Sequence, residues 1–173
     1  MTARLPAVRS GIGYDVHRLV AGRPLVIGGV WFASDVGLEG HSDADVLLHA
    51  IADAILGAAA LGDIGQHFPP HDPQWAGADS IMLLSSCIER LRVTGWDVGN
   101  IDATVIAEQP RINPRAAEMR ARIAGATGLD IGSVSLKATT NELLGSIGRG
   151  EGIAAIAIAT IVRRPADAEA GVG

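Results

Sequence analysis

The chain has 173 residues, of which 48% are hydrophobic and 19% charged, and its formal net charge at pH 7 is -5. This composition predicts one compact domain, and the acidic balance, with only 3% aromatic residues, argues against a nucleic-acid-binding surface. No apolar run approaches the roughly 18 residues that span a bilayer, and no signal-peptide core is present. Because the single cysteine, Cys87, permits no internal disulfide, we expect a cytoplasmic protein without membrane contact.

The first predicted strand covers residues 10–19 and carries two chemistry-bearing side chains. Alternate residues of a strand share a face, so Asp15 and His17 point to the same side of the sheet. A carboxylate and an imidazole in this arrangement suit a divalent ion such as zinc, although a solvent-facing ion pair explains them equally well. Residues 1–9 and 164–173 are expected to be flexible ends.

An apolar strand is predicted over residues 25–32. Gly28 and Gly29 inside it indicate a bulge or a close backbone approach. Residues 33–40 then form a loop that leads to His41.

A buried helix is predicted at about 43–60. Ser42 and Asp45 resemble a capping box at its start. Asp45, His49 and Asp53 recur every four residues and form a polar line on a helix that is otherwise apolar. Buried imidazoles and carboxylates need partners, which include a metal, a backbone carbonyl or one another. Asp45 and Asp53 are interpreted as partners that orient His49 or neighbouring loops.

A segment rich in glycine and proline follows at residues 58–73. Its composition argues against regular structure and favours a lid or ligand-contacting loop, in which His67 and His71 are most simply solvent-exposed. A helix is predicted from about 79 to 94, with Cys87 as a packing residue.

The remaining elements alternate between strands and a helix. Periodicity predicts strands at 97–108 and 133–139, a break at 109–114 and a helix at 114–127. A final strand at 153–162 is apolar on both faces, so it should lie in the centre of the sheet or at a subunit contact. From these patterns the fold class is α/β or α+β.

Residues 140–152 combine hydroxyl groups, a carboxylate, Arg149 and several glycines after a strand. Hydroxyl and backbone N–H donors beside an arginine make a plausible cradle for a phosphate or diphosphate. Together with Asp15, His17 and His49, which form a three-ligand set for zinc, this cradle predicts metal-assisted phosphoryl chemistry. No serine or cysteine nucleophile is evident, which favours attack by water or by the substrate itself.

At this point several motifs, in order and in register, resemble the 2-C-methyl-D-erythritol 2,4-cyclodiphosphate synthase family. They are GYDVH (13–17), HSDADVLLH (41–49), GAAALGDIG (57–65), KATT (137–140) and GRGEG (148–152). The resemblance extends over about residues 10–162.

The resemblance implies a reaction, an assembly and two metals. The 2-phosphate of 4-diphosphocytidyl-2-C-methyl-D-erythritol 2-phosphate attacks the β-phosphorus of the same molecule, and CMP leaves. Members are homotrimers with active sites between subunits, and they use zinc and a second divalent ion, Mg²⁺ or Mn²⁺. The implied fold is a single-domain sandwich, a mixed sheet with helices on one face and the sheets turned toward the three-fold axis.

The resemblance also implies roles for individual residues. Zinc would be held by Asp15, His17 and His49, and the second ion by Glu142. His41 and Thr140 would orient phosphates and stabilise the transition state. Substrate contacts are expected from Ser42, Asp63, Ile64, Gly65, Ala107, Pro110, Arg111, Ile112, Asn113, Thr139, Thr140, Asn141, Glu142 and Arg149.

One departure from the family concerns the axis of the trimer. Arg149 resembles the family arginine near an axial cavity that takes an anionic isoprenoid diphosphate, but Ser146 stands where many members have Phe, which argues against that ligand here. Two alternatives remain: a zinc-dependent phosphohydrolase, which would give a linear product, and a non-enzymatic metal-binding module.

Overall fold

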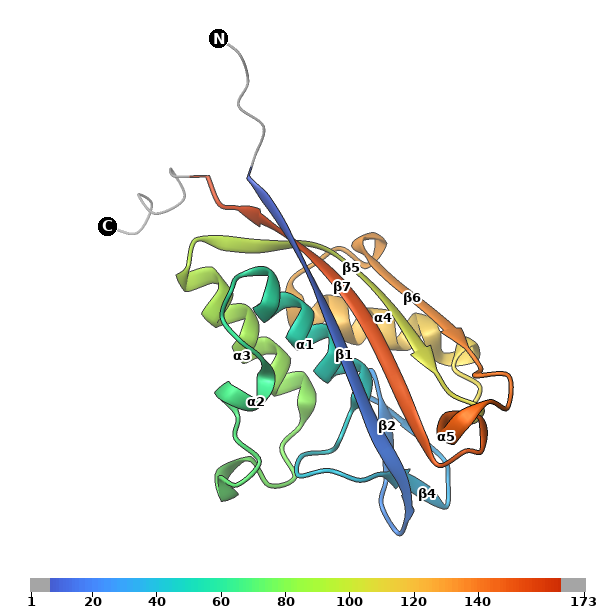
Figure 1. Cartoon of the computed structure of the whole chain (residues 1–173). Coiled ribbons are helices and arrows are strands. Elements are labelled where there is room, and N and C mark those ends of the chain that lie inside the picture. Colours follow the sequence, from blue (N-terminus) through green and yellow to red (C-terminus); the bar gives the residue numbers. More distant parts are fainter. Residues whose placement is uncertain (1–6, 166–173) are drawn as a thin grey trace.

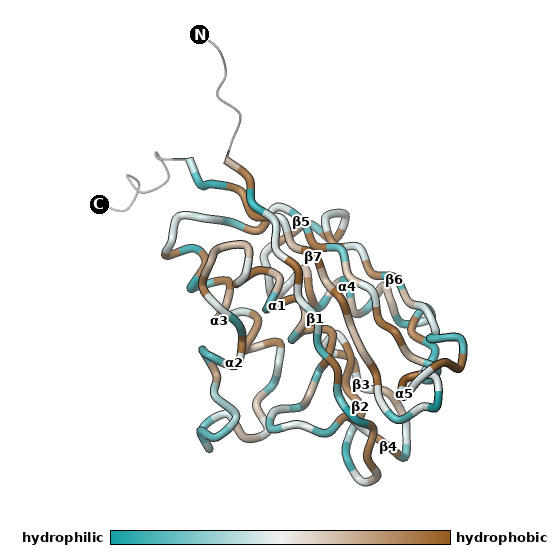
Figure 2. Tube along the Cα trace, in the orientation of Figure 1, coloured by the Kyte–Doolittle hydropathy of each residue, from teal (hydrophilic) through white to brown (hydrophobic). Residues whose placement is uncertain are grey.

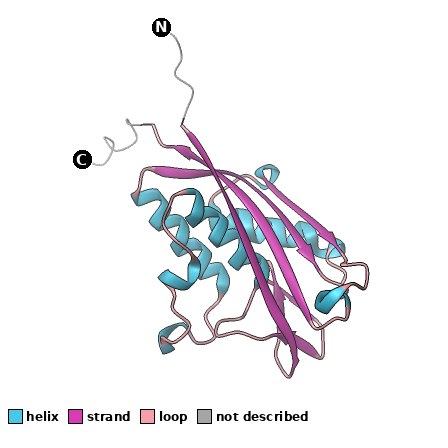
Figure 3. Ribbon diagram, in the orientation of Figure 1, coloured by secondary structure: helices cyan, strands magenta, loops and turns pink. Residues whose placement is uncertain are grey.

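A five-stranded mixed sheet forms one layer of the structure, a computed structural model that describes residues 7–165 (Figures 1 and 3). The strand order is β4-β1-β7-β5-β6, in which β5 and β6 are parallel and the other neighbours antiparallel. The strands are β1 (Val8–Ala21), β4 (Val36–Leu38), β5 (Trp96–Ile106), β6 (Val134–Thr139) and β7 (Gly152–Arg163). The predicted mixed sheet is therefore confirmed.

The long helices cover one face of this sheet, as predicted (Figure 1). The long ones are α1 (Val46–Ala58), α3 (Ser80–Val93) and α4 (Ala116–Thr127), and the short ones are α2 (Ile64–His67) and α5 (Gly145–Gly148). Helix α1 lies against β1 and β7 and is buried over most of its length, because its residues are apolar on nearly all sides. In the part of the chain that the structure describes, no helix is both long and apolar enough to span a bilayer.

Strand β7 is central, as its sequence predicts, and its two faces differ. Alanines on the inner face, such as Ala155 and Ala157, are fully buried beneath the helices. On the outer face Ile156 is 40% exposed and Ile158 is 46% exposed. Figure 2 shows hydrophobic residues along this strand. The sheet thus carries apolar side chains on a face that residues 7–165 leave exposed.

Glycines on the inner face of β1 let α1 approach the strand closely. A Cβ atom on Gly13 would lie 2.0 Å from the carbonyl oxygen of Ala50, and one on Gly11 would lie 2.2 Å from that of Ala54. A side chain at either position would therefore push the helix away from the strand.

Residues 25–32 differ from the predicted single strand. They form a hairpin of β2 (Leu25–Ile27) and β3 (Val30–Phe32), joined by Gly28 and Gly29. Both glycines have a positive φ, +62° and +71°, which is the backbone that a two-residue hairpin turn with matching twist requires. The pair therefore reverses the chain, so the prediction of one continuous strand was wrong.

Helix α1 begins at Val46 and not at 43, because Ala44 has a φ of 57° and interrupts the helical backbone. Asp45 is the N-cap, and its side chain accepts hydrogen bonds from the backbone N–H groups of Leu47 and Leu48 at 3.1 Å each. The predicted capping box with Ser42 at the cap was therefore wrong.

Asp45 also anchors the hairpin. Its two carboxylate oxygens accept from the N–H groups of Gly28 at 2.9 Å and Gly29 at 2.7 Å, so one buried side chain joins the helix start to the hairpin turn. Burial raises the pKa of Asp45 to about 6, against the effect of these backbone donors. Asp53 has a similar role, since its Oδ1 accepts from the N–H of Ile64 at 2.7 Å. Of the two interpretations, the one in which these carboxylates orient neighbouring loops is correct.

Four other predictions need correction. Residues 33–40 are not only a loop, because β4 lies there and pairs with the end of β1. Residues 58–73 are not free of regular structure, because α2 and the start of a 3-10 turn at Pro73–Trp75 lie there. Helix α4 begins at Ala116, since Pro114 belongs to a preceding 3-10 turn. Val8 and Arg9 belong to β1 and are not a loose end; residues 1–6 and 166–173 lie outside the described residues. The other predicted boundaries agree within two residues, and Cys87 is buried as predicted.

Candidate active site

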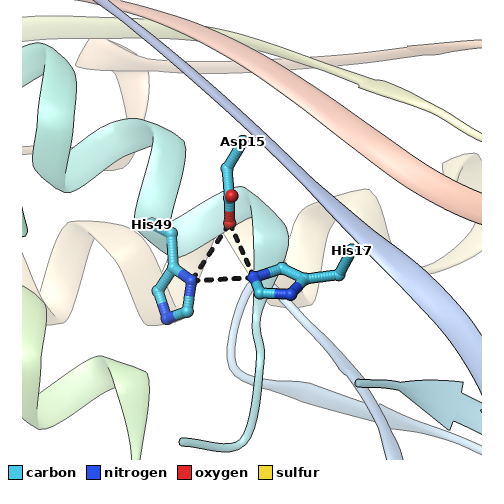
Figure 4. A group of neighbouring side chains, drawn as sticks. All are labelled: Asp15, His17 and His49. Atoms are coloured by element: carbon cyan, nitrogen blue, oxygen red, sulfur yellow. Dashed lines mark hydrogen bonds and ion pairs between the residues drawn. The ribbon is translucent and has the colours of Figure 1, made fainter. Parts of the chain in front are cut away.

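Three side chains converge where β1 passes the first turn of α1 (Figure 4). Asp15 Oδ2 lies 2.9 Å from His17 Nε2 and 3.0 Å from His49 Nδ1, and the two ring nitrogens are 3.3 Å apart. Asp15 and His17 project from the inner face of β1, as the alternation of the strand predicts. The close contact of α1 with this strand brings His49 to the same point.

Hydrogen bonds outside the cluster leave the converging atoms free to act as ligands. His17 Nδ1 lies 2.6 Å from the carbonyl oxygen of Glu39, which only accepts, so the neutral ring carries its proton there and has its lone pair on Nε2. The second oxygen of Asp15 accepts from the N–H of Val16 at 2.9 Å. His49 Nε2 faces the hydroxyl groups of Ser42 and Ser80. Each of the three side chains is therefore oriented by a hydrogen bond on the side that faces away from the cluster.

Without a metal ion, the Asp15 carboxylate and the His17 imidazole stabilise each other's charged forms. Burial raises the pKa of Asp15, but hydrogen bonds from His17 and His49 outweigh burial and hold that pKa well below its usual range. Burial lowers the pKa of His17, but the hydrogen bond to Asp15 outweighs this and leaves the pKa raised.

The cluster fits a divalent metal. One ligand atom from each of Asp15, His17 and His49 lies within 4.8 Å of the others. In a tetrahedral zinc site with bonds of roughly 2.0–2.2 Å, ligand atoms lie about 3.3–3.5 Å apart, so a small outward movement of the carboxylate makes room for the ion. One carboxylate and two imidazoles also match the ligand types of catalytic zinc sites with an open fourth position.

A cavity of about 330 Å³ opens beside these ligands. Besides the three ligands it is lined by His41, Ser42, Ile64 and Gly65, all of which the sequence predicted as site residues. Asp63 is not in this lining but caps α2, where its carboxylate accepts from the N–H of Gln66 at 2.9 Å.

A second, larger cavity of about 620 Å³ lies where β5 and β6 end. Its lining includes Ala107, Pro110, Arg111, Ile112, Asn113, Thr139, Thr140 and Glu142, all of which the resemblance implied as substrate contacts. Within one chain the structure therefore separates the predicted site residues into two cavities, and neither Thr140 nor Glu142 lines the metal cavity.

Besides Asp63, two predicted residues line neither cavity. Asn141 donates from its side-chain amide to the carbonyl oxygen of Leu144 at 2.7 Å. Arg149 donates to Glu151 at 2.6 Å, beside a smaller hollow lined in part by Ser146.

The sequence did not reveal Glu108, which holds the loop that carries Glu142. Its Oε1 accepts from the N–H groups of Asn141 at 2.9 Å and Leu143 at 3.2 Å. Glu142 and Leu143 both have positive φ, 50° and 60°, a backbone that side chains rarely adopt. The only sequence signal for Glu108 was an acidic residue at the end of a predicted strand.

Comparisons with known proteins are consistent with this geometry. The model of the YgbB family matches residues 8–162. A 2-C-methyl-D-erythritol 2,4-cyclodiphosphate synthase of Synechococcus elongatus is 56% identical over 155 residues, 90% of this chain and 97% of that protein. The solved bifunctional IspDF of Campylobacter jejuni is 40% identical with a TM-score of 0.88, over 91% of this chain and 43% of that one. IspF of Plasmodium falciparum, solved as a CDP complex, is 31% identical with a TM-score of 0.81, over 92% and 98% of the two chains.

Proposed function

The chain belongs to the YgbB family, and we propose that it is a 2-C-methyl-D-erythritol 2,4-cyclodiphosphate synthase of non-mevalonate isoprenoid biosynthesis, a phosphorus–oxygen lyase. Its substrate is 4-diphosphocytidyl-2-C-methyl-D-erythritol 2-phosphate. An oxygen of the 2-phosphate bonds to the β-phosphorus as the bond from that phosphorus to the oxygen of CMP breaks. The products are the cyclic diphosphate and CMP.

The convergence of three ligand atoms beside a cavity is the observation that carries this proposal. Asp15, His17 and His49 would hold zinc, which supplies Lewis-acid stabilisation of charge on a phosphoryl oxygen. His41 lines the same cavity, where its Nε2 lies 3.2 Å from the carbonyl oxygen of Asp72, and its imidazole would orient a phosphate.

The larger cavity would bind the nucleotide end of the substrate. Glu142 offers carboxylate oxygens, which Mg²⁺ and Mn²⁺ prefer, for a second ion. Thr140 donates from its hydroxyl to that carboxylate at 3.1 Å and would orient a phosphate. The backbone around the cis peptide bond between Gln109 and Pro110 would face the cytosine, and the CDP complex of the Plasmodium falciparum relative supports such a pocket.

The remaining predicted contacts keep their proposed roles. Ser42, Asp63, Ile64, Gly65, Thr139, Asn141 and Arg149 would contact the methylerythritol, ribose or phosphate groups. The buried thiol of Cys87 is compatible with the reducing cytoplasm, where we place the protein.

We propose that the chain assembles as a homotrimer, with the sheets facing the three-fold axis. Large apolar side chains on the outer face of β1 are open in the single chain, with Ile12 70% exposed and Tyr14 58% exposed. Such a patch marks a protein contact surface. The separation of the two cavities supports active sites between subunits, because a zinc cavity and a nucleotide cavity must meet to act on one substrate.

The test is to incubate the purified protein with the substrate and Mg²⁺, with and without a chelator, and to follow the products by ³¹P NMR. We expect stoichiometric CMP and a cyclic diphosphate, both abolished by the chelator. A linear product would instead identify a zinc-dependent phosphohydrolase. No turnover by the folded, zinc-loaded protein would leave a metal-binding module.

A further inference from the structure

The buried hydroxyl group of Ser80 connects His49 to a carboxylate that lies outside the metal cluster. Ser80 is the first residue of α3 and is 1% exposed. Its Oγ lies 3.0 Å from His49 Nε2 and also donates to Oδ1 of Asp43. The backbone N–H of Ser80 donates to the other oxygen of Asp43 at 3.0 Å.

When Nδ1 of His49 holds a metal ion, the number of protons in this chain of contacts fixes the direction of each hydrogen bond. An ionised carboxylate only accepts hydrogen bonds, so the single hydroxyl proton of Ser80 points to Asp43. The lone pairs of Oγ then accept from His49, which requires a proton on Nε2. A neutral imidazole has one proton, so Nδ1 then has the lone pair that a metal ion needs. Without an ion, the carboxylate of Asp15 lies 3.0 Å from Nδ1 and competes with Ser80 for this proton.

We propose that Ser80, oriented by Asp43, is a positioning residue that holds His49 as the Nε2–H tautomer and thereby presents Nδ1 to the metal. The proposal rests on the proposed function in taking Asp15, His17 and His49 as the metal site. Neither Ser80 nor Asp43 contacts the substrate cavity in this role; both act through His49.

Ser42 also lies near Nε2 of His49, but it has less influence on which ring nitrogen carries the proton. Its Oγ is farther away, at 3.3 Å, and it accepts from the N–H of Ala44 at 3.1 Å. Within the described residues its hydroxyl proton has no carboxylate to point to, so it does not impose a direction on the His49 ring.

The relay, by which we mean Asp43, Ser80 and His49, is rigid because hydrogen bonds with the backbone fix Asp43 and the helical turn that carries Ser80. Asp43 donates its N–H to the carbonyl oxygen of Ala78 at 3.0 Å and accepts from the N–H of Asp45 at 3.2 Å. Asp79 caps α3 by accepting from the N–H of Ile81 at 2.8 Å, which fixes the first turn that carries Ser80. The hydroxyl therefore occupies a defined place before any ion binds.

Two variants and a matched control test the relay. Ser80→Ala removes the hydroxyl but keeps the backbone bond to Asp43. Asp43→Asn replaces an acceptor with an amide that can donate to the Ser80 hydroxyl, which frees the hydroxyl proton to point at His49 Nε2. Ser85→Ala makes the same change on the same helix, where the hydroxyl bonds only to the carbonyl oxygen of Ile81.

The first measurement is the His49 tautomer, read by long-range ¹H–¹⁵N NMR of the metal-free protein at a pH above imidazole titration. Because Asp15 and Ser80 compete for the ring proton, we expect the Nε2–H fraction to fall from the wild type to Ser80→Ala and further in Asp43→Asn, and to stay unchanged in Ser85→Ala. The second is the zinc dissociation constant, measured by competition with a chromophoric chelator. It should rise about 10- to 100-fold in both relay variants and stay unchanged in the control.

The proposal is overturned if Ser80→Ala retains both the wild-type fraction of the Nε2–H tautomer and the wild-type zinc affinity. Circular dichroism establishes folding, and if Ser80→Ala does not fold, the Asp43→Asn spectrum decides alone. Failure of the wild type to bind zinc would contradict the proposed function, whereas the tautomer measurement would still test the relay.

Discussion

The ion pair between Asp15 and His17 makes the stability of the metal-free chain depend on pH. The lowered pKa of Asp15 contributes stability above its unfolded value of 3.8, and this is lost as the pH falls. The raised pKa of His17 contributes stability below its unfolded value of 6.5, and this is lost as the pH rises through the folded pKa. The pair therefore stabilises the metal-free chain most between these two values.

Above neutral pH, zinc should reverse the way in which the stability of the chain depends on pH. Protons compete with the ion for His17, so zinc affinity increases as the pH rises, while the contribution of the ion pair declines. We expect the thermal midpoint to fall between pH 6 and 8 in chelator and to rise with zinc. A His17→Gln variant is the control, because its thermal midpoint in chelator should no longer fall between pH 6 and 8. An equal slope in this variant and in the wild type would show that other groups are responsible.

At the scale of elements, Gly13 determines how closely α1 lies on β1. Gly13→Ala places a Cβ against the Ala50 carbonyl oxygen, so the helix must move and carry His49 with it. We expect a loss of about 3 kcal/mol in the free energy of unfolding, measured with urea, together with weaker zinc binding.

Gly125 in α4 provides the control for that change. A Cβ there meets no atom within 4 Å, so Gly125→Ala should stabilise the protein by about 0.5–1 kcal/mol through helix propensity. Equal effects of the two substitutions would contradict the close approach of strand and helix.

Glu108 holds the loop after β6 in place, and its removal should change how turnover depends on Mg²⁺. Glu108→Ala removes the acceptor for the N–H groups of Asn141 and Leu143, so the loop loses the contact that holds Glu142 in its unusual backbone. We expect the Mg²⁺ concentration for half-maximal turnover to rise about tenfold, while zinc affinity is unchanged because the zinc ligands lie in the other cavity. A parallel loss of zinc would indicate general unfolding instead.

Elements were easier to predict than their interactions. Alternation and 3.6-residue periodicity located most strands and helices, because each pattern is local. The hairpin at Gly28 was missed because a glycine pair within an apolar run fits a bulge as well as a turn, and the contact that supports the turn comes from Asp45, 17 residues away. Ser80 and Glu108 were missed for the same reason, as their partners lie 31 and 33 residues away. Local motifs identified the ligands but not the cavity that each residue lines.

At the scale of the whole molecule, the exposed outer face of the sheet predicts the oligomeric state. Ile158→Asp puts a charge on this face, and burying it in an interface would cost several kcal/mol. We expect light scattering to show monomers in place of trimers, with turnover lost as well. Val93→Asp is the control, because Val93 is 89% exposed at the end of α3. An unchanged mass for Ile158→Asp would contradict the proposed interface.

The central position of β7 has a consequence for how the chain folds. Its residues pair with β1 over nearly the whole length of both strands, from Val8 with Val162 to Arg18 with Gly152. These contacts span almost the full described sequence, and such high contact order slows folding. Of the strands described, β7 leaves the ribosome last, so until then β1 and β5 have open inner edges. The nascent chain should therefore rely on chaperones at this stage and complete its sheet only once β7 has emerged.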